Sequence, residues 1–138
     1  MEENQTQKKG KITELQVLTY FLNKGYVLSQ PIIDMRYDFL LDYNDYIYKI
    51  QVKTSRLSPD GDYIEFNTSN SHTNTQGTVN KNYKGQIDYF ATFYENQCYL
   101  IPVEECGSRN KRLRILPPKN GQTKGICFLE NYTLEKIL

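Results

Sequence analysis

The sequence predicts an α+β fold, in which an N-terminal helix packs on a mostly antiparallel sheet and a small helical segment ends the chain. Apolar residues recur at helical spacing over residues 11–23, and strand-like segments separated by turn residues follow over residues 26–103. At 138 residues, the chain has the size of one common domain. We therefore expect a single domain over residues 11–138, preceded by a polar, flexible tail at residues 1–10.

The expected helix carries Leu15, Leu18 and Leu22 at helical spacing. Gly25, in the run Asn23-Lys24-Gly25, favours a helix end at this point. A short strand at residues 26–28 follows and is ended by Pro31.

Residues 36–56 predict a hairpin, because Asn44-Asp45 separates two runs of strand-forming residues. Further strands are expected at Tyr63–Asn67, 87–94 and 99–103. Residues 69–85 are polar and are expected to form a long loop, which at this length is usually functional or mobile. A short C-terminal helix is expected to begin near Asn131 or Thr133.

Polar side chains occur on both arms of the expected hairpin, although these strands also carry apolar residues and burying a polar group without a partner costs free energy. Side chains alternate between the faces of a strand, so Gln51 and Lys53 share one face. Pairing around Asn44-Asp45 brings Asp38 nearly opposite Gln51. Glu14 lies at the edge of the apolar stripe of the helix, and a carboxylate aimed at a sheet needs a partner. The pattern therefore gathers two carboxylates, an amide and an ammonium.

This set of side chains suits a divalent cation held against a phosphodiester. Mg²⁺ takes oxygen ligands and keeps several waters, so one or two carboxylates and a substrate phosphate suffice. Asp38 and Gln51 offer such oxygens, and Lys53 can stabilise developing charge or orient a water molecule. The expected cofactor is Mg²⁺, with Mn²⁺ as a possible substitute. The alternative interpretation is that Asp38 pairs with Arg36 or Lys49 on a solvated sheet face.

A resemblance to a known family rests on the same residues. Tyr37-Asp38, then Gln51-Val52-Lys53 on the next strand, preceded by Glu14 on the first helix, resemble the core of the PD-(D/E)xK nuclease superfamily. Within it, the chain is most similar to the PD-(D/E)xK-type homing endonucleases of group I introns, in which Gln replaces the acid of (D/E)xK. The similarity covers about residues 11–118.

The resemblance implies a restriction-endonuclease-like core and a metal-dependent DNA endonuclease that makes double-strand cuts. It implies that Asp38, Gln51 and Glu14 bind the metal and that Lys53 is the catalytic lysine. The sequence departs from the signature at Tyr37, which stands where Pro is usual. Gln51 also brings no negative charge, so the site has fewer carboxylates and should bind metal more weakly unless Glu14 compensates.

The expected partner is double-stranded DNA, although the formal net charge is only +1. Screening limits each charge to about 8–10 Å, so local basic clusters can bind phosphates in a nearly neutral chain. The candidate DNA-binding residues are Lys9, Lys11, His72, Asn74, Lys81, Asn82, Lys84, Arg109, Lys111 and Arg112. The alternative for these residues is an ordinary solvated surface.

One subunit offers one active site, so cutting both strands implies a homodimer, and the intron-encoded relatives imply a homotetramer. Nothing in the sequence approaches the roughly 18 consecutive apolar residues of a membrane span. Three separated cysteines without a CxxC pair fit neither a disulfide framework nor a zinc site, and a cytoplasmic location is expected.

Two other hypotheses remain open. The spacing of Glu14, Asp38, Gln51 and Lys53 is also similar to that in archaeal Holliday-junction resolvases, which are structure-selective nucleases. The chain could instead be a nucleic-acid-binding module whose nuclease site has decayed. Metal dependence separates the enzymes from the module, and preference for four-way junctions separates the two enzymes.

Overall fold

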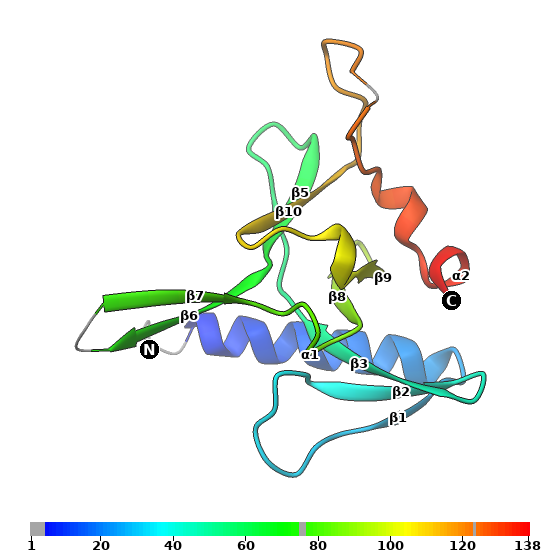
Figure 1. The fold of residues 1–138 in the computed structure, drawn as a ribbon. Coiled ribbons are helices and arrows are strands. Elements are labelled where there is room, and N and C mark those ends of the chain that lie inside the picture. Colours follow the sequence, from blue (N-terminus) through cyan, green and yellow to red (C-terminus); the bar gives the residue numbers. More distant parts are fainter. Residues whose placement is uncertain (1–4, 75–76, 123) are drawn as a thin grey trace.

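The computed structural model describes residues 5–74, 77–122 and 124–138. These residues form two α-helices, two short 3-10 helices and a set of strands, and Figure 1 shows their arrangement. They are α1 (Gln5–Asn23), β1 (Val27–Ser29), β2 (Phe39–Tyr43), β3 (Tyr46–Val52), β4 (Arg56–Leu57), β5 (Tyr63–Asn67), β6 (Ser69–Asn74), β7 (Gly77–Asn82), β8 (Tyr89–Tyr94), β9 (Gln97–Pro102), η2 (Val103–Glu105), β10 (Asn110–Arg114), η3 (Leu129–Tyr132) and α2 (Leu134–Ile137).

Helix α1 begins at Gln5, six residues earlier than the sequence predicts. The expectation of a flexible tail is therefore wrong for residues 5–10, which are helical, while residues 1–4 lie outside the described residues. The physical reason is intrinsic propensity: Gln and Lys are good helix formers, and a single glycine, Gly10, costs only about 1 kcal/mol within a helix.

The helix packs on the sheet through Thr13, Val17 and Phe21, which are its buried residues. Leu15 and Leu22, in contrast, are 54% and 59% exposed. The helix face that contacts the sheet is therefore the one that carries Val17 and Phe21, next to the row of leucines that the sequence suggests.

Five strands form the main sheet, in the order β1-β2-β3-β8-β9. Only β3 and β8 run parallel, so the prediction of a mostly antiparallel sheet is confirmed. The β2–β3 hairpin turns at Asn44 and Asp45, whose φ values of 50° and 66° are those of a type I′ turn. Its register sets Phe39 opposite Ile50, as the predicted pairing requires.

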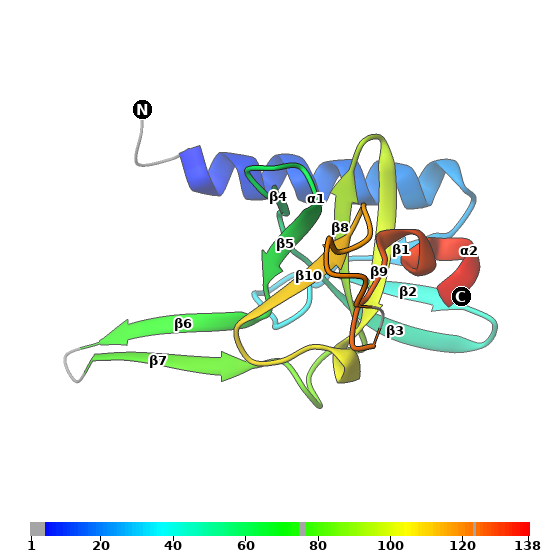
Figure 2. The same ribbon diagram turned by 90° about the horizontal axis from the view of Figure 1, so that it is seen from above.

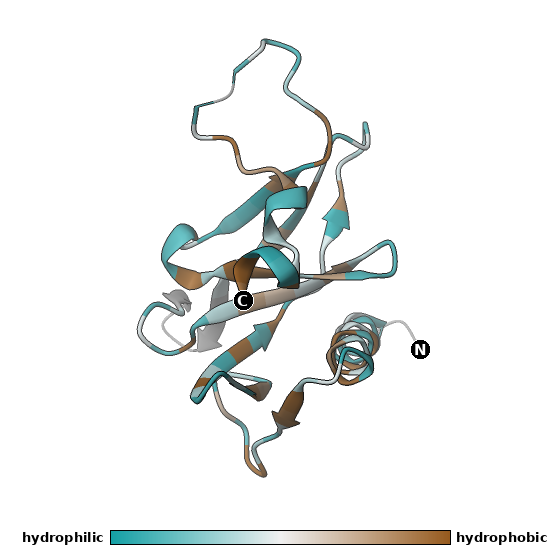
Figure 3. Cartoon of the chain, turned by 90° about the vertical axis from the view of Figure 1, so that its right-hand side faces the viewer, coloured by the Kyte–Doolittle hydropathy of each residue, from teal (hydrophilic) through white to brown (hydrophobic). Residues whose placement is uncertain are grey.

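Apolar side chains form two cores, one on each face of this sheet. Helix α1 covers one face, and Figure 3 shows it nearly end-on beside the strands. Strands β5 and β10 and the C-terminal segment pack against the other face. The first core includes Val17, Phe21, Phe39, Leu41 and Ile50, and the second includes Ile64, Phe66, Phe90, Ile101 and Leu113. The predicted α+β architecture is confirmed.

The expected long loop at residues 69–85 contains a β-hairpin, so that prediction is wrong. Strands β6 and β7 pair antiparallel from Ser69↔Asn82 to Asn74↔Gly77 and extend away from the rest of the molecule (Figure 2). The sequence reads as a loop because its Ser, Thr and Asn residues do not alternate with apolar ones. Backbone pairing between the two arms provides the order instead, since each strand satisfies the hydrogen bonds of the other.

Glu65 joins the three strands of a second sheet, ordered β10-β5-β4. Its two carboxylate oxygens lie 2.6 Å from Arg112 Nε and 2.7 Å from Arg56 Nη2. The hydrogen bond from Arg112, supported by that from Arg56, holds the pKa of Glu65 below its ordinary value.

We expect Glu65→Gln to lower the free energy of unfolding by about 1 kcal/mol at pH 7. The folded-state pKa of Glu65 is depressed, so its stabilising contribution is present above the unfolded-state pKa and is lost as the pH falls through the folded-state pKa. Urea unfolding of both proteins at pH 7 and at a pH that protonates Glu65 measures this. A loss that persisted unchanged in acid would contradict the ionic contribution.

The chain ends in η3 and α2, where a short C-terminal helix is expected. Among the residues that the structure describes, no helix is both long and apolar enough to cross a membrane.

Candidate active site

Asp38 lies immediately before β2, where regular pairing with β3 ends. Its backbone nitrogen donates to the carbonyl oxygen of Ile50 at 2.8 Å, and its Oδ2 accepts from the backbone nitrogen of Val52, also at 2.8 Å. Because these two partners flank Gln51 in the sequence, Asp38 is fixed beside Gln51. Gln51 is half-buried, and its Nε2 lies 3.4 Å from the carbonyl oxygen of Val52.

Glu14 approaches the same region from helix α1. Its side chain is only 16% exposed. Its Oε2 accepts a hydrogen bond from Lys11 Nζ at 3.0 Å, and its Oε1 accepts one from Gln30 Nε2 at 3.3 Å. These contacts hold the carboxylate over the segment that leads from β1 into β2.

A polar hollow of about 250 Å³ opens between α1 and this segment. Glu14 and Asp38 both line it, together with Tyr37. Residues 31–35 also line it, and Ile32 and Ile33 among them are largely exposed. Since one water molecule occupies about 30 Å³ of liquid, the hollow has room for a cation with part of its hydration shell.

Lys53 directly follows β3, and its side chain is half-buried. Its backbone nitrogen donates to the carbonyl oxygen of Ala91 in β8 at 2.9 Å. Its Nζ donates to the carbonyl oxygen of Ser69 at 3.4 Å and to the phenolic oxygen of Tyr83 at 3.3 Å. Both the main chain and the ammonium of Lys53 are therefore tied to neighbouring elements.

Burial penalises both charges of the site. It raises the pKa of Asp38; the Val52 amide opposes this shift, the Glu14 carboxylate adds to it, and Lys53 opposes it. Burial likewise lowers the pKa of Lys53, with Asp38 opposing the shift and Arg36 adding to it. The carboxylates of Asp38 and Glu14 repel each other in a partly desolvated site, and a bound cation would relieve that repulsion.

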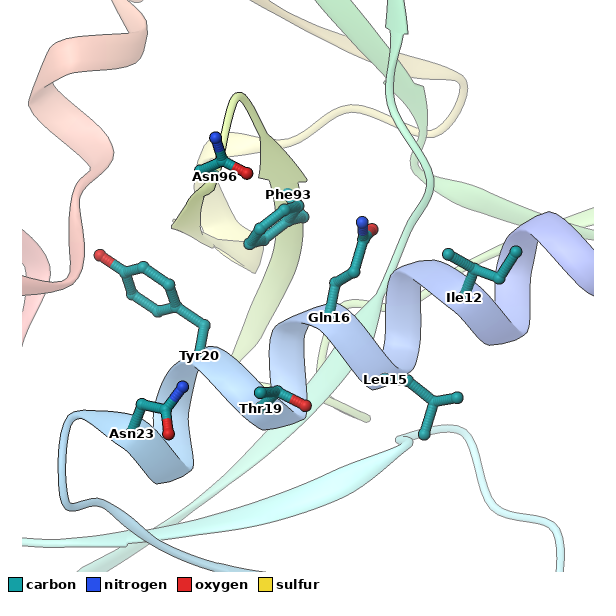
Figure 4. A pocket seen from close by; sticks show the side chains of 8 residues that line it. All are labelled: Ile12, Leu15, Gln16, Thr19, Tyr20, Asn23, Phe93 and Asn96. Atoms are coloured by element: carbon teal, nitrogen blue, oxygen red, sulfur yellow. The ribbon is translucent and has the colours of Figure 1, made fainter.

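A larger hollow of about 510 Å³ lies between α1 and the β8–β9 turn (Figure 4). Gln16 and Tyr20 of the helix point toward Phe93 and Asn96 across it. The residues described as lining it include no carboxylate, lysine or histidine. This hollow therefore lacks the groups that hydrolysis of a phosphodiester requires, and the polar hollow at Asp38 remains the candidate active site.

A family model described as PD-(D/E)XK endonuclease matches residues 4–135 of the chain. The chain belongs to this family. A solved structure of a bacterial homing endonuclease, I-Ssp6803I, has a similar fold, with a TM-score of 0.75 and 23% sequence identity over 94% of this chain and 88% of that chain. Among curated proteins, no sequence matches. The family and the endonuclease-like fold predicted from the sequence are confirmed, and family membership makes the chain a nuclease with DNA as its substrate.

Nucleases of the PD-(D/E)XK family generally use divalent metal ions, and the residues at the hollow fit one. Glu14 and Asp38 offer carboxylate oxygens, and Gln51 beside Asp38 offers an amide oxygen, which are ligands that Mg²⁺ accepts. Across residues 5–74, 77–122 and 124–138, no three His, Cys, Asp or Glu side chains form a metal-binding group. Gln51 is not among the residues that line the hollow, but it lies beside Asp38, which does line it.

The DNA-binding residues predicted near the helix and hairpin occupy two places. Lys9 and Lys11 are exposed near the start of α1, and Lys11 pairs with Glu14. Four others belong to the projecting hairpin: His72 and Asn74 in β6, and Lys81 and Asn82 in β7. The side chains of these four lie outside what the structure describes. Lys84, just after the hairpin, is exposed.

The predicted residues of the basic segment lie on and before β10. Arg109 is exposed, with its carbonyl oxygen accepting from the backbone nitrogen of Thr68. Lys111 Nζ donates to the carbonyl oxygen of Glu105 at 2.9 Å, and Arg112 is paired with Glu65. A phosphate would have to compete with these contacts at Lys111 and Arg112.

Sequence reasoning gives no role at the candidate site to Tyr83, and it considers Arg36 only as an ion-pair partner of Asp38. The guanidinium carbon of Arg36 lies 3.9 Å from the centroid of the Tyr83 ring, and Lys53 Nζ lies 4.8 Å from the same centroid. Arg36 stands two residues before Asp38, which is a usable signal. No sequence signal points to Tyr83, because only folding brings it, near the end of the polar segment at residues 69–85, next to Lys53.

Proposed function

We propose that this chain is a Mg²⁺-dependent endodeoxyribonuclease that cuts both strands of double-stranded DNA in the manner of a homing endonuclease. The proposal rests on one observation, which is that a chain of the PD-(D/E)XK endonuclease family brings two carboxylates and a lysine close together. Glu14 and Asp38 line one polar hollow, and Lys53 is close enough to Asp38 for each to shift the pKa of the other. The fold similarity to I-Ssp6803I supports the homing-type assignment.

Asp38, Gln51 and Glu14 would hold the divalent cation. When bound, that cation supplies Lewis-acid polarisation of the phosphoryl oxygens and lowers the pKa of a water molecule. Asp38 is oriented for this by the Val52 amide, which occupies its Oδ2. Lys53 places a positive charge beside the phosphate, where it stabilises the charge that develops in the transition state.

Two active sites are needed to cut both strands, and each chain offers one. We therefore propose a homodimer or homotetramer, with a two-fold axis that matches the dyad of the duplex. The β6–β7 hairpin supports a DNA-binding surface, because it extends from the body and a two-stranded ribbon fits the major groove.

We expect the variant Lys81→Gln/Lys84→Gln to bind duplex DNA more weakly and with less dependence on salt. Each lost phosphate contact reduces the slope of log K against log[salt] by about 0.9, so two contacts reduce it by about 1.8. Fluorescence anisotropy of a labelled duplex over a series of NaCl concentrations gives this slope. Lys119→Gln/Lys124→Gln removes the same charge from another exposed segment and should leave the slope unchanged.

Cleavage of supercoiled plasmid and of a four-way junction tests the proposed function. With Mg²⁺ or Mn²⁺ we expect linear plasmid product, and with EDTA we expect none. Stronger cutting of the junction than of linear duplex would favour the resolvase hypothesis instead. Binding to DNA without any cutting, under each metal and on a randomised library of duplex targets, would favour the decayed binding module.

A further inference from the structure

The ammonium of Lys53 is bound at the base of the projecting hairpin. One of its partners, the carbonyl oxygen of Ser69, belongs to the first residue of β6, and the other, the hydroxyl of Tyr83, belongs to the residue directly after β7. We call Ser69 and Tyr83 the hairpin base. Lys53 thus contacts both chain segments through which the hairpin joins the body.

Tyr83 is firmly held by the core beneath the main sheet. It is 4% exposed, and its ring lies edge-on to Phe90 with centroids 5.3 Å apart. Its carbonyl oxygen accepts hydrogen bonds from the backbone nitrogens of Gln86 and Ile87 at 2.9 and 3.3 Å. A buried aromatic ring with few rotatable bonds offers a fixed point for the hydroxyl that meets Lys53.

The other half of the hairpin base is anchored as well. Thr68, which precedes Ser69, is 1% exposed. Its backbone nitrogen donates to the carbonyl oxygen of Arg109 at 2.8 Å, and its Oγ1 donates to the carbonyl oxygen of Gly107 at 2.7 Å. The fold therefore determines the positions of both acceptors of the Lys53 ammonium, whereas the four-carbon side chain of a lysine is flexible on its own.

We propose that Tyr83 is a positioning residue for Lys53: its hydroxyl, together with the Ser69 carbonyl, holds the catalytic ammonium at a fixed place relative to the hairpin. This inference rests on the proposed function. It makes the hairpin base and the ammonium one rigid unit, so that seating of the hairpin on DNA sets which phosphate Lys53 meets. Arg36, stacked on the same ring, adds a second positive charge to that unit.

Three variants test the proposal by single-turnover cleavage with enzyme in excess. Tyr83→Phe keeps the ring and removes the hydroxyl, and we expect it to cut about 10- to 100-fold more slowly, because it loses a hydrogen bond to a charged group. Tyr83→Leu also removes the ring and should be slower still. Tyr132→Phe is the matched control, since Tyr132 is 6% exposed in the same core and donates to Glu105 at 2.6 Å, away from Lys53.

DNA affinity and lysine labelling separate positioning from general loss of structure. We expect DNA affinity to stay unchanged in Tyr83→Phe, and we expect Lys53 to react faster with an acetylating reagent in both Tyr83 variants, as measured by mass spectrometry. Tyr132→Phe should change neither quantity. A wild-type cleavage rate in Tyr83→Phe, or unchanged labelling of Lys53, would overturn the positioning role alone. A wild-type chain that cuts no DNA would overturn the nuclease itself.

Discussion

The Asp38→Asn variant is expected to lose DNA cleavage by about 10³-fold or more. A cation at this position supplies several kcal/mol of transition-state stabilisation, and each 1.36 kcal/mol is worth tenfold in rate. Asn is nearly isosteric and can still accept the hydrogen bond from Val52, but it cannot offer an anionic oxygen to the cation. Single-turnover cleavage of plasmid in Mg²⁺ measures the loss.

Asp42→Asn provides the matched control for this prediction. Asp42 is an exposed carboxylate on β2, four residues after Asp38. Asp42→Asn also removes one negative charge and should leave the cleavage rate within about twofold of wild type, because substituting an exposed residue away from the active site has little effect. Equal rates for Asp38→Asn and wild type would remove Asp38 from the active site.

Stability shows whether Asp38→Asn acts through chemistry or through unfolding. The folded-state pKa of Asp38 is raised, chiefly by burial, so ionised Asp38 costs folding free energy above that pKa and costs nothing below the unfolded-state pKa. Without metal, the variant should therefore be at least as stable as wild type at pH 7. The difference should vanish at about pH 3, where the carboxyl is protonated in both states. Scanning calorimetry in EDTA measures both values.

The second large effect is expected at Lys53. Lys53→Met should reduce the cleavage rate by about 10²–10³-fold, which is the usual cost of removing one donor that stabilises transition-state charge. Lys53→Arg should not restore the rate, because a planar guanidinium cannot replace a compact ammonium between the Ser69 carbonyl and the Tyr83 hydroxyl.

Lys49→Met is the control for the lysine series. Lys49 is exposed on β3, and its Nζ lies over the ring of Tyr37 at 5.9 Å from the centroid. Lys49→Met removes one positive charge close to the site. Among the described hydrogen bonds, none joins the Lys49 side chain to Asp38 or Lys53. If Lys49→Met lost as much rate as Lys53→Met, the effect would be one of net charge rather than of a placed ammonium.

Much of the β2–β3 hairpin could be predicted because its signals are local. Asn44-Asp45 accepts the left-handed backbone of a tight turn, and strand alternation then fixes which residues share a face. Once the register is set, Asp38 has to lie beside Gln51. The early start of α1 has no apolar pattern to indicate it, because residues 5–10 include no large apolar side chain and helix propensity alone extends the helix there.

The projecting hairpin and the surroundings of Lys53 depend on contacts between segments that are distant in the sequence. Strands β6 and β7 carry no apolar alternation, so pairing between their backbones is invisible to pattern reasoning. Tyr83, which contacts Lys53, lies 30 positions after it in the sequence, and Arg36, which stacks on the Tyr83 ring, lies well before both. These surroundings are assembled by the tertiary fold, and the sequence alone indicates only Glu14, Asp38, Gln51 and Lys53 as candidate site residues.

Crystals soaked in Mn²⁺ and measured for anomalous scattering test the central claim most directly. We expect one strong anomalous peak in the hollow, within bonding distance of a carboxylate oxygen of Asp38 and of the side-chain oxygen of Gln51, with Glu14 as a direct ligand or joined through water. Crystals of Asp38→Asn should lack this peak. A Mn²⁺ ion bound elsewhere, or an equal peak in the variant, would contradict the assignment of Asp38, Gln51 and Glu14 as the metal site.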